Sequence, residues 1–273
     1  MDTAAGTARS YLFVPGNRPD RYAKACAAGA DAVIVDLEDA VPPAEKGAAR
    51  DALAAWLDDP AQPVLVRINA ADTPWFRDDL ALCAKEGVAG IVLPKAESAD
   101  DIATVAAAGA RAVLPLVESA RGFWHAHALA HATGVERLVF GTIDFCLDLG
   151  LVESSEQLQY FRSQLVLVSR LAGIAAPVDG VTTAFDDPSA IDADTLRARH
   201  GGFGAKLCIH PRQVGHVNRA FAPTPDELSW AGRVLAAADA SAGAAVAVDG
   251  KMVDLPVLAM AQRMVAEAQR RLG

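Results

Sequence analysis

Residues 114–150 read LPLVESARGFWHAHALAHATGVERLVFGTIDFCLDLG, and this stretch decides the expected fold. It contains two apolar runs, one that ends directly before Glu118 and one that ends shortly before Asp144. The residues between the two acids suffice for a crossover helix, because parallel strands need a connection of about a dozen residues or more. We therefore expect both carboxylates at the carboxyl ends of neighbouring strands, where open α/β sheets and barrels build their sites.

A pair of carboxylates in this position is typical of half of a site for a hard metal ion, with substrate and water as the other ligands. Two alternatives remain open. Either acid can be the N-cap of a following helix, and Glu118 can pair with the nearby Arg121. The metal site is favoured because other strand ends carry the same kind of residue.

The whole chain alternates short β-rich runs with Ala-rich, often amphipathic helical stretches, such as residues 156–172. The runs are SYLFVP (10–15), DAVIVD (31–36), PVLVRI (63–68), GIVLP (90–94), AVLPLV (112–117), RLVFG (137–141), APVDGV (176–181) and GAKLCI (204–209). Continuous apolar strands separated by helices predict a parallel sheet that is buried on both faces. Eight such units are typical of an α/β fold of the TIM (β/α)8 barrel type. A doubly wound open sheet is the alternative, but no GxGxxG or GxxxxGK[ST] motif follows any run.

Polar residues follow most of these runs. They are Asp36, Glu38, Asp39, Arg67, Asn69, Lys95, Glu118, Asp144, Asp179 and His210. In a closed barrel all strand ends meet at one rim, so we expect these residues to form one polar cluster. The alternative is that connecting loops are polar in general.

Length and composition limit the class of protein. The chain has 273 residues, of which 52% are hydrophobic and 22% charged, and its net charge is −9. An α/β barrel of this length is commonly a single domain. The acidic balance, without a basic arm, argues against nucleic-acid and anionic-membrane partners. The chain also lacks a signal-like or membrane-spanning apolar stretch, which predicts a soluble cytoplasmic protein.

The four cysteines are widely spaced and include no CxxC pair, which favours buried free thiols over a zinc site or disulfides. They are Cys26, Cys83, Cys146 and Cys208. Residues 1–222 are expected to form the barrel, and residues 223–273 a C-terminal helical lid or oligomerisation segment. In that segment Asp254 precedes a final helix opened by Pro256, so its local interpretation is an acid that stabilises a helix start. The expected apolar face of this helix consists of Val257, Met260, Met264 and Ala268.

Eight motifs along the chain resemble the citrate lyase β-subunit-like and malyl-CoA lyase family, which are acyl-CoA carbon–carbon lyases on a TIM barrel. The motifs are YLFVPGNRPDRYAKA (11–25), VIVDLEDAV (33–41), VRIN (66–69), VLPKAES (92–98), LVESARG (116–122), FGTIDFCLDLG (140–150), KLCIHPRQV (206–214) and GKMVDLPVL (250–258). They occur in the family's order and at family-like spacing, nearly from end to end. One departure is Asp39, which stands where related aldolases carry a histidine base, so proton transfer by histidine is not available there.

The resemblance implies roles for particular residues. Glu118 and Asp144 would hold Mg²⁺, with Mn²⁺ as an alternative, and Glu118 would also contact substrate. Arg67 would bind substrate, whereas Phe13, Arg18 and Lys24 would line the site for coenzyme A. Family members are oligomers, commonly trimers, so a homotrimer or a dimer of trimers is expected. In such an oligomer the C-terminal tail caps the neighbouring barrel and brings Asp254 to its reaction centre in trans.

These residues suit the cleavage of a thioester that bears a β-hydroxyl group. Arg67 is forked and always charged, which suits an enolate or a carboxylate, although an anchoring salt bridge is the alternative. Asp36 and Glu38 would belong to the catalytic set by orienting Arg67 or holding water, with turn acids as the alternative. A Schiff base on Lys95 is disfavoured, because surrounding acids favour the charged amine and the carboxylate pair has no purpose in that mechanism.

The expected function is a Mg²⁺-dependent carbon–carbon lyase. It would cleave a short 3-hydroxy-acyl thioester, of the citramalyl-CoA or malyl-CoA type, into an acyl-CoA and a 2-oxo acid. A citryl thioester lyase or a malyl-CoA thioesterase is an alternative with the same metal. A catalytically silent barrel that binds acyl-CoA is the alternative from another class.

Overall fold

The computed structural model describes residues 4–60, 62–152, 155–240 and 246–269. The chain consists of two compact units, Met1–Asn218 and Arg219–Gly273. The first unit carries all the strand ends considered above, and the second carries Asp254. The division after residue 222 and the lid or oligomerisation role of residues 223–273 stay predictions.

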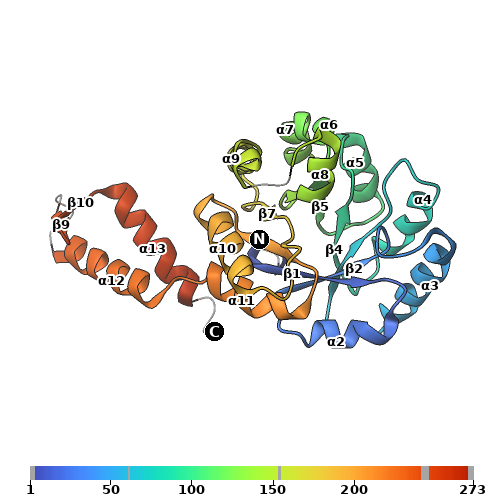
Figure 1. Cartoon of the computed structure of the whole chain (residues 1–273), viewed down its shortest axis with the longest axis horizontal. Coiled ribbons are helices and arrows are strands. Elements are labelled where there is room, and N and C mark those ends of the chain that lie inside the picture. The colour runs from blue at the N-terminus through green and yellow to red at the C-terminus, as the bar shows by residue number, and fades with distance from the viewer. Residues whose placement is uncertain (1–3, 61, 153–154, 241–245, 270–273) are drawn as a thin grey trace. The chain divides into compact units, whose positions relative to one another are not determined.

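The first unit is a closed barrel of parallel strands in chain order, with β1 paired to both β2 and β8 (Figure 1). The strands are β1 (Ser10–Pro15), β2 (Ala32–Asp36), β3 (Val64–Arg67), β4 (Val88–Leu93), β5 (Val113–Val117), β6 (Val139–Phe140), β7 (Val178–Asp179) and β8 (Ala205–Cys208). Each strand overlaps the run that predicted it. The pairing of Ser10 with Lys206 closes the sheet and excludes the open-sheet alternative. The TIM barrel is therefore confirmed.

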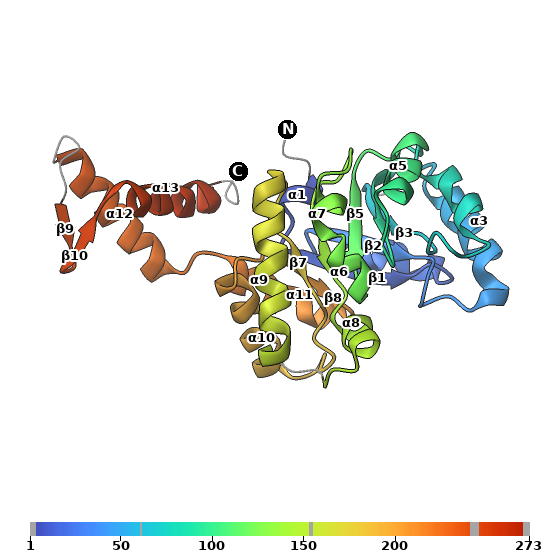
Figure 2. The same cartoon turned by 90° about the horizontal axis from the view of Figure 1, so that it is seen from above.

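Helices surround this barrel (Figures 1 and 2). They are α1 (Ala4–Thr7), α2 (Tyr22–Cys26), α3 (Lys46–Trp56), α4 (Phe76–Asp79), α5 (Ala99–Ala107), α6 (Ala120–Trp124), α7 (Ala126–Ala130), α8 (Thr142–Leu149), α9 (Ser155–Ala172), α10 (Pro188–His200) and α11 (Pro211–Phe221), with 3₁₀ turns at Pro19–Arg21, Pro43–Glu45 and Leu80–Leu82. Their ends follow local chemistry: Ser98 caps α5 by accepting from Asp100 N, and Gly150 ends α8 in the left-handed conformation.

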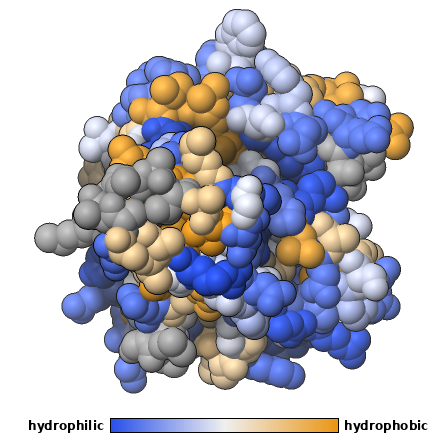
Figure 3. All heavy atoms as spheres, turned by 90° about the vertical axis from the view of Figure 1, so that its left-hand side faces the viewer, coloured by the Kyte–Doolittle hydropathy of each residue, from blue (hydrophilic) through white to orange (hydrophobic). Residues whose placement is uncertain are grey.

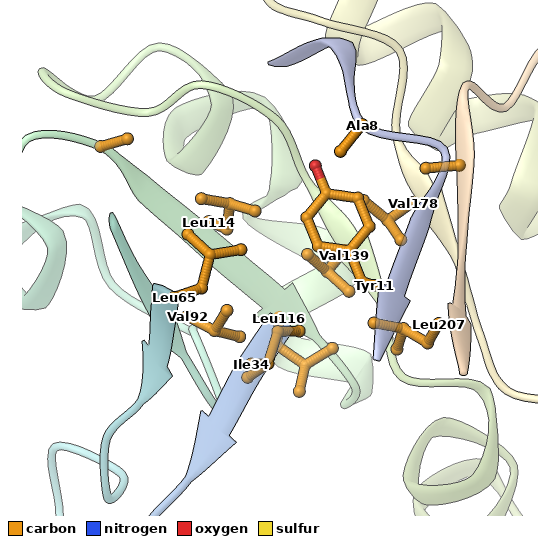
Figure 4. Close-up of a cluster of buried hydrophobic side chains, with 12 residues drawn as sticks. Ala8, Tyr11, Ile34, Leu65, Val92, Leu114, Leu116, Val139, Val178 and Leu207 are labelled. Atoms are coloured by element: carbon orange, nitrogen blue, oxygen red, sulfur yellow. The ribbon is translucent and has the colours of Figure 1, made fainter. Parts of the chain in front are cut away.

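Apolar side chains fill the inside of the barrel. Alternate residues of each strand point inward, such as Leu114 and Leu116 of β5, and they pack around Tyr11 (Figure 4). The Tyr11 hydroxyl accepts a hydrogen bond from Nη1 of the fully buried Arg137 at 2.9 Å. Arg137 also donates to the carbonyl groups of Ala8 and Ala176, which precede β1 and β7. These contacts fill the amino end of the barrel interior.

The second unit is a helical hairpin with a small sheet. It contains α12 (Pro225–Ala240), the antiparallel strands β9 (Val246–Val248) and β10 (Lys251–Val253), and α13 (Leu255–Gln269) (Figure 1). The β-hairpin was not predicted, although Asp249 and Gly250 form a typical turn pair. Both have positive φ, 51° and 75°, as a two-residue turn of this kind requires.

The apolar face of α13 differs from the predicted one. Val257, Leu258, Ala261, Met264 and Val265 pack in the core of the second unit, whereas Met260 is exposed. Met252 and Leu255 are exposed as well. Figure 3 shows one face of the molecule, on which apolar residues lie among hydrophilic ones. The second unit therefore leaves part of its apolar surface uncovered.

The four cysteines, all of which lie in the described ranges, form no disulfide, and Cys26 is only half-buried. Over the ranges that the structure describes, no helix combines the length and the apolar character that crossing a bilayer requires.

Candidate active site

A cavity of about 420 Å³ lies at the carboxyl ends of the barrel strands. Polar and charged side chains from several strand ends line it together with apolar ones. The charged lining residues are Asp36, Asp39, Arg67, Glu118 and Asp144. The barrel rim thus brings together the residues after the second, third, fifth and sixth strands, as the sequence predicted.

Asp36 and Arg67 are directly paired residues of β2 and β3. Nε and Nη2 of Arg67 each donate to Asp36 at 2.7 Å, which is the bidentate geometry of a strong ion pair. The guanidinium also lies 4.8 Å from the centre of the Phe13 ring. Burial lowers the pKa of Arg67, but the hydrogen bonds and charge of Asp36 outweigh burial and leave that pKa raised. Arg67 is a fixed cation in the wall of the cavity.

Glu38 is buried beside this pair. Its Oε2 lies 3.0 Å from Arg67 Nη1 but has no aligned hydrogen-bond partner among the described residues. Lys95 Nζ is 3.8 Å from Oε1. Burial raises the pKa of Glu38 to about 7, and the neighbouring Asp39 and Asp36 add to this, against the attraction of Arg67. The Glu38 carboxyl group can therefore exchange a proton near neutral pH.

Glu118 follows β5 and is also buried. Its Oε1 accepts a hydrogen bond of 2.7 Å from the backbone nitrogen of Lys95, whose φ of 46° is unusual for a lysine. Burial raises the pKa of Glu118 to about 8, and repulsion by Glu38 and Asp144 contributes. Gly141 leaves room for this carboxylate, since a Cβ atom there would lie 2.7 Å from Glu118 Oε2.

The structure excludes the two local alternatives for Glu118. Ser119, and not Glu118, is the N-cap of α6, and Arg121 pairs with Glu97 at 3.6 Å. Asp144 lies in the first turn of α8, where Gly141 occupies the cap position. Neither acid is therefore an N-cap.

The carboxylates fit a hard divalent cation. Glu118 and Asp144 line one cavity and present only oxygen atoms to a cation. Burial and the charge of Glu38 raise the Glu118 pKa, and repulsion by Asp144 adds to this rise. A divalent cation would relieve this repulsion, and Mg²⁺ prefers such ligands. Within the described ranges no three His, Cys, Asp or Glu residues form a complete metal cluster, so further ligands would come from substrate and water.

Other residues at the strand ends lie elsewhere. Asn69 is buried and donates to Asp79 at 2.6 Å. Asp179 points to the outside of the barrel, where it pairs with Arg162 at 2.9 Å, so its predicted place in the polar cluster is wrong. The reason is that successive side chains of a strand point to opposite faces. Val178 points into the barrel, so the next residue, Asp179, points outward. His210 stacks on Phe185 and does not line the cavity.

The residues predicted for coenzyme A are only partly at the cavity. Phe13 lines it, whereas the half-buried Arg18 pairs with Asp20 at 2.8 Å, and Lys24 lies exposed on α2. In the second unit, Asp254 precedes α13 and its Oδ1 accepts from Val257 N at 3.3 Å. The local interpretation of Asp254 as a helix-start acid is therefore confirmed, and its action in trans stays a prediction.

Sequence reasoning missed one residue that holds the site together. Lys46 Nζ is buried and donates to the carbonyl groups of Leu37 at 2.8 Å and Glu38 at 2.7 Å. These bonds fasten the loop that follows Asp36 and carries Glu38. The only sequence signal was a lysine near the start of a helix, which is ordinarily a surface position.

Fold and cavity together define the class of this protein: a TIM barrel with paired carboxylates and a largely buried arginine at its carboxyl end. The chain matches the HpcH/HpaI aldolase/citrate lyase family over residues 9–211 and belongs to that family. The resemblance found in the sequence motifs is thereby confirmed.

Several relatives match nearly end to end. A citrate lyase subunit beta-like protein of Deinococcus radiodurans is 38% identical, with 97% of this chain and 99% of the relative covered. A (3S)-malyl-CoA thioesterase of Cereibacter sphaeroides is 34% identical over 96% of this chain and 94% of the relative. The crystal structure of protein CitE from Mycobacterium tuberculosis with magnesium, acetoacetate and coenzyme A superposes with a TM-score of 0.85. That structure is 37% identical and covers 97% of this chain and 99% of its own.

Proposed function

We propose that this protein is a Mg²⁺-dependent carbon–carbon lyase that cleaves a short 3-hydroxy-acyl-CoA of the citramalyl-CoA or malyl-CoA type. The observation that carries the proposal is the presence of Glu118, Asp144 and the buried Arg67 in one cavity. The magnesium, acetoacetate and coenzyme A in the related CitE structure support the same class of ligands. The products would be an acyl-CoA and a 2-oxo acid.

The cleavage needs a proton taken from the β-hydroxyl group, a broken carbon–carbon bond and a proton returned to the enolate carbon. Glu118 and Asp144 would hold Mg²⁺ or Mn²⁺, which when bound polarises substrate oxygen atoms as a Lewis acid. Arg67 stabilises negative charge at the substrate carboxylate or enolate, because it is a fixed cation in a partly dry cavity. Glu38, with its raised pKa, is suited to exchange a proton at neutral pH. Asp36 orients Arg67.

The remaining roles extend this proposal. Phe13, Arg18 and Lys24 would contact coenzyme A, and Asp254 of a neighbouring subunit would complete the site in a homotrimer or a dimer of trimers. The apolar side chains that the second unit leaves exposed support packing against another chain. The cytoplasm is the expected location.

A second candidate is a thioesterase that hydrolyses malyl-CoA. The similarity to the (3S)-malyl-CoA thioesterase favours it, since that relative matches over nearly the whole chain. Hydrolysis would use the same cavity: water would attack the thioester carbonyl, the carbon–sulfur bond would break, and coenzyme A would leave as the thiol. A citryl thioester is the alternative substrate, supported by the citrate lyase subunit beta of Leuconostoc mesenteroides at 34% identity.

The test is an assay of the purified protein with malyl-CoA, citramalyl-CoA and citryl-CoA, each with Mg²⁺ or with EDTA. A lyase releases a 2-oxo acid and no free thiol, whereas a thioesterase releases free coenzyme A and no 2-oxo acid. We expect Mg²⁺-dependent 2-oxo acid with malyl-CoA or citramalyl-CoA. Free thiol alone would establish the thioesterase, and neither product from any thioester would support the silent barrel. Full turnover in EDTA would refute the metal mechanism.

A further inference from the structure

We propose that a second pocket of the first unit binds a small oxyanion, of the phosphate or short carboxylate class. This outer pocket lies outside the barrel, between β7 and β8 on one side and α9 and α10 on the other, and its volume is about 330 Å³. Figures 1 and 2 show both helices on this side of the barrel. Its polar lining consists of Arg162, Thr182, Thr183, Asp194, Arg197 and Lys206.

Buried charges form the inner wall of the outer pocket. Asp179 and Lys206 are directly paired on β7 and β8, and both point away from the barrel interior. Lys206 Nζ lies 3.6 Å from Asp179 Oδ2 and donates to the carbonyl of Gly180 at 2.7 Å. Arg162 reaches in from α9 and its Nε donates to Asp179 Oδ1 at 2.9 Å. Arg162 and Lys206 are 6% and 2% exposed, so both are held away from bulk water.

Helix α10 supplies the opposite wall. Asp194 accepts from the Thr182 hydroxyl at 2.8 Å and from Arg197 Nη2 at 2.7 Å. Burial raises the pKa of Asp194, but the Thr182 hydrogen bond and the charges of Lys206 and Arg197 outweigh burial and leave that pKa below its usual value. The surroundings of Asp194 therefore favour negative charge.

The charges of the outer pocket do not balance. Three cationic side chains face two carboxylates, those of Asp179 and Asp194. Over the described part of the chain, two donors, Arg162 Nη1 and Arg197 Nε, are buried without a hydrogen-bond partner. One acceptor, Asp179 Oδ2, is buried in the same way, 3.6 Å from Lys206 Nζ. Buried cationic donors without acceptors are costly, and an oxyanion supplies both acceptors and the missing negative charge. Water would satisfy the donors but would leave the excess positive charge.

The outer pocket is separate from the catalytic cavity, although Val181 lines both. Lys206 holds the carbonyl of Gly180, a residue that also lines the catalytic cavity. An anion in the outer pocket would therefore lie on the outer side of the carboxyl end of β7, and this strand end would separate it from the catalytic cavity.

The test is calorimetric titration of the full-length protein with inorganic phosphate, and separately with malonate, at constant ionic strength. We expect saturable one-site binding of at least one of the two anions. Arg197→Gln should weaken it at least about tenfold, which is a loss of about 1.4 kcal/mol. Arg197→Lys should recover most of the affinity, because it restores the positive charge.

Two matched variants separate binding in the outer pocket from binding elsewhere on the protein. Arg170→Gln, which removes an exposed arginine from α9, should leave the affinity unchanged. Arg67→Gln tests the catalytic cavity and should also leave it unchanged. The proposal is overturned if neither anion saturates, if binding is lost in Arg67→Gln, or if Arg197→Gln binds as tightly as the wild type. Equal thermal stability of Arg197→Gln and Arg197→Lys ensures that lost binding is not lost folding.

Discussion

Asp36 accepts two parallel hydrogen bonds from Arg67, from Nε and from Nη2, each at 2.7 Å. The bidentate edge of the guanidinium is thus occupied by a residue of the neighbouring strand. Nη1 lies 3.0 Å from Glu38 Oε2, and the second hydrogen of Nη2 is not used by Asp36. The anchoring ion pair of Arg67 is therefore present in the structure, and the contact of Arg67 with substrate stays a prediction.

Arg67→Lys should lose most of the turnover. A lysine cannot bond to both oxygens of Asp36 and also reach substrate, so we expect kcat/KM to fall at least ~10²-fold. Arg50→Lys is the matched control, because Arg50 pairs with Asp78 and Asp79 away from the cavity. The measurement is steady-state kinetics on both variants. A kcat/KM of Arg67→Lys near that of the wild type would show that Arg67 is purely structural.

Glu118→Gln and Asp144→Asn should each abolish activity and the stabilisation by Mg²⁺. Removing one charged oxygen ligand of a pair leaves too little attraction for a strongly hydrated cation. The measurement is the rise of Tm on adding Mg²⁺, which binding to the native state alone produces. Asp148→Asn, on the same helix as Asp144, should retain the rise. A full Mg²⁺ response in Glu118→Gln would refute Glu118 as a ligand.

Glu38→Gln should stabilise the metal-free protein at alkaline pH. The pKa of Glu38 is about 7 in the folded protein and 4.5 ordinarily, so the folded state retains this proton longer than the unfolded state. The contribution of Glu38 to the free energy of unfolding is therefore fully present below pH 4.5 and is lost as the pH rises to about 7. At about 1.4 kcal/mol per pH unit, the loss is at most ~3.5 kcal/mol.

In thermal unfolding with EDTA, Glu38→Gln should match the wild type near pH 4.5 and exceed its Tm by several degrees at pH 8.5. The exposed Glu86→Gln should follow the wild type at both pH values. A lower Tm for Glu38→Gln at pH 8.5 would mean that attraction to Arg67 dominates over burial.

Lys46→Met should reduce activity at least ~10-fold. The substitution leaves the buried carbonyl groups of Leu37 and Glu38 without their donor. It thereby loosens the loop whose backbone nitrogens, at Glu38 and Ala40, donate to Asp36. Lys85→Met is the control, because Lys85 pairs with the exposed Asp58. A reduced kcat at unchanged Tm and Mg²⁺ response would indicate positioning. Unchanged kinetics would show that the backbone hydrogen bonds between neighbouring strands hold the loop without Lys46.

Asp254→Asn should remove activity and leave α13 intact, because asparagine caps a helix start as well as aspartate does. As a general acid, Asp254 should contribute ~10²–10⁴-fold to the rate. Mixed oligomers of Asp254→Asn and Glu118→Gln subunits, formed by dissociation and reassembly, should recover part of the turnover. Verified mixed oligomers without any recovery would exclude action of Asp254 in trans.

Much of the barrel could be predicted from the sequence because its signals are local. Continuous apolar runs such as 112–117 mark strands that are buried on both faces, and Ser98 marks a helix start that the structure confirms. Strand ends converge in any closed barrel, so Asp36, Arg67, Glu118 and Asp144 could be placed at one cavity before any coordinates were known.

The sequence by itself determined which residues end the strands and therefore which chemical groups surround the cavity. Only the tertiary structure decided which way a side chain points and what it meets. Asp179 shows this, because a shift of one residue along a strand moves a side chain from the rim to the outer layer. Lys46 shows it too, since it begins α3 and its partners are backbone carbonyl groups of the loop after β2. Burial, pairing and pKa depend on contacts between distant segments, and those contacts exist only after the barrel has closed.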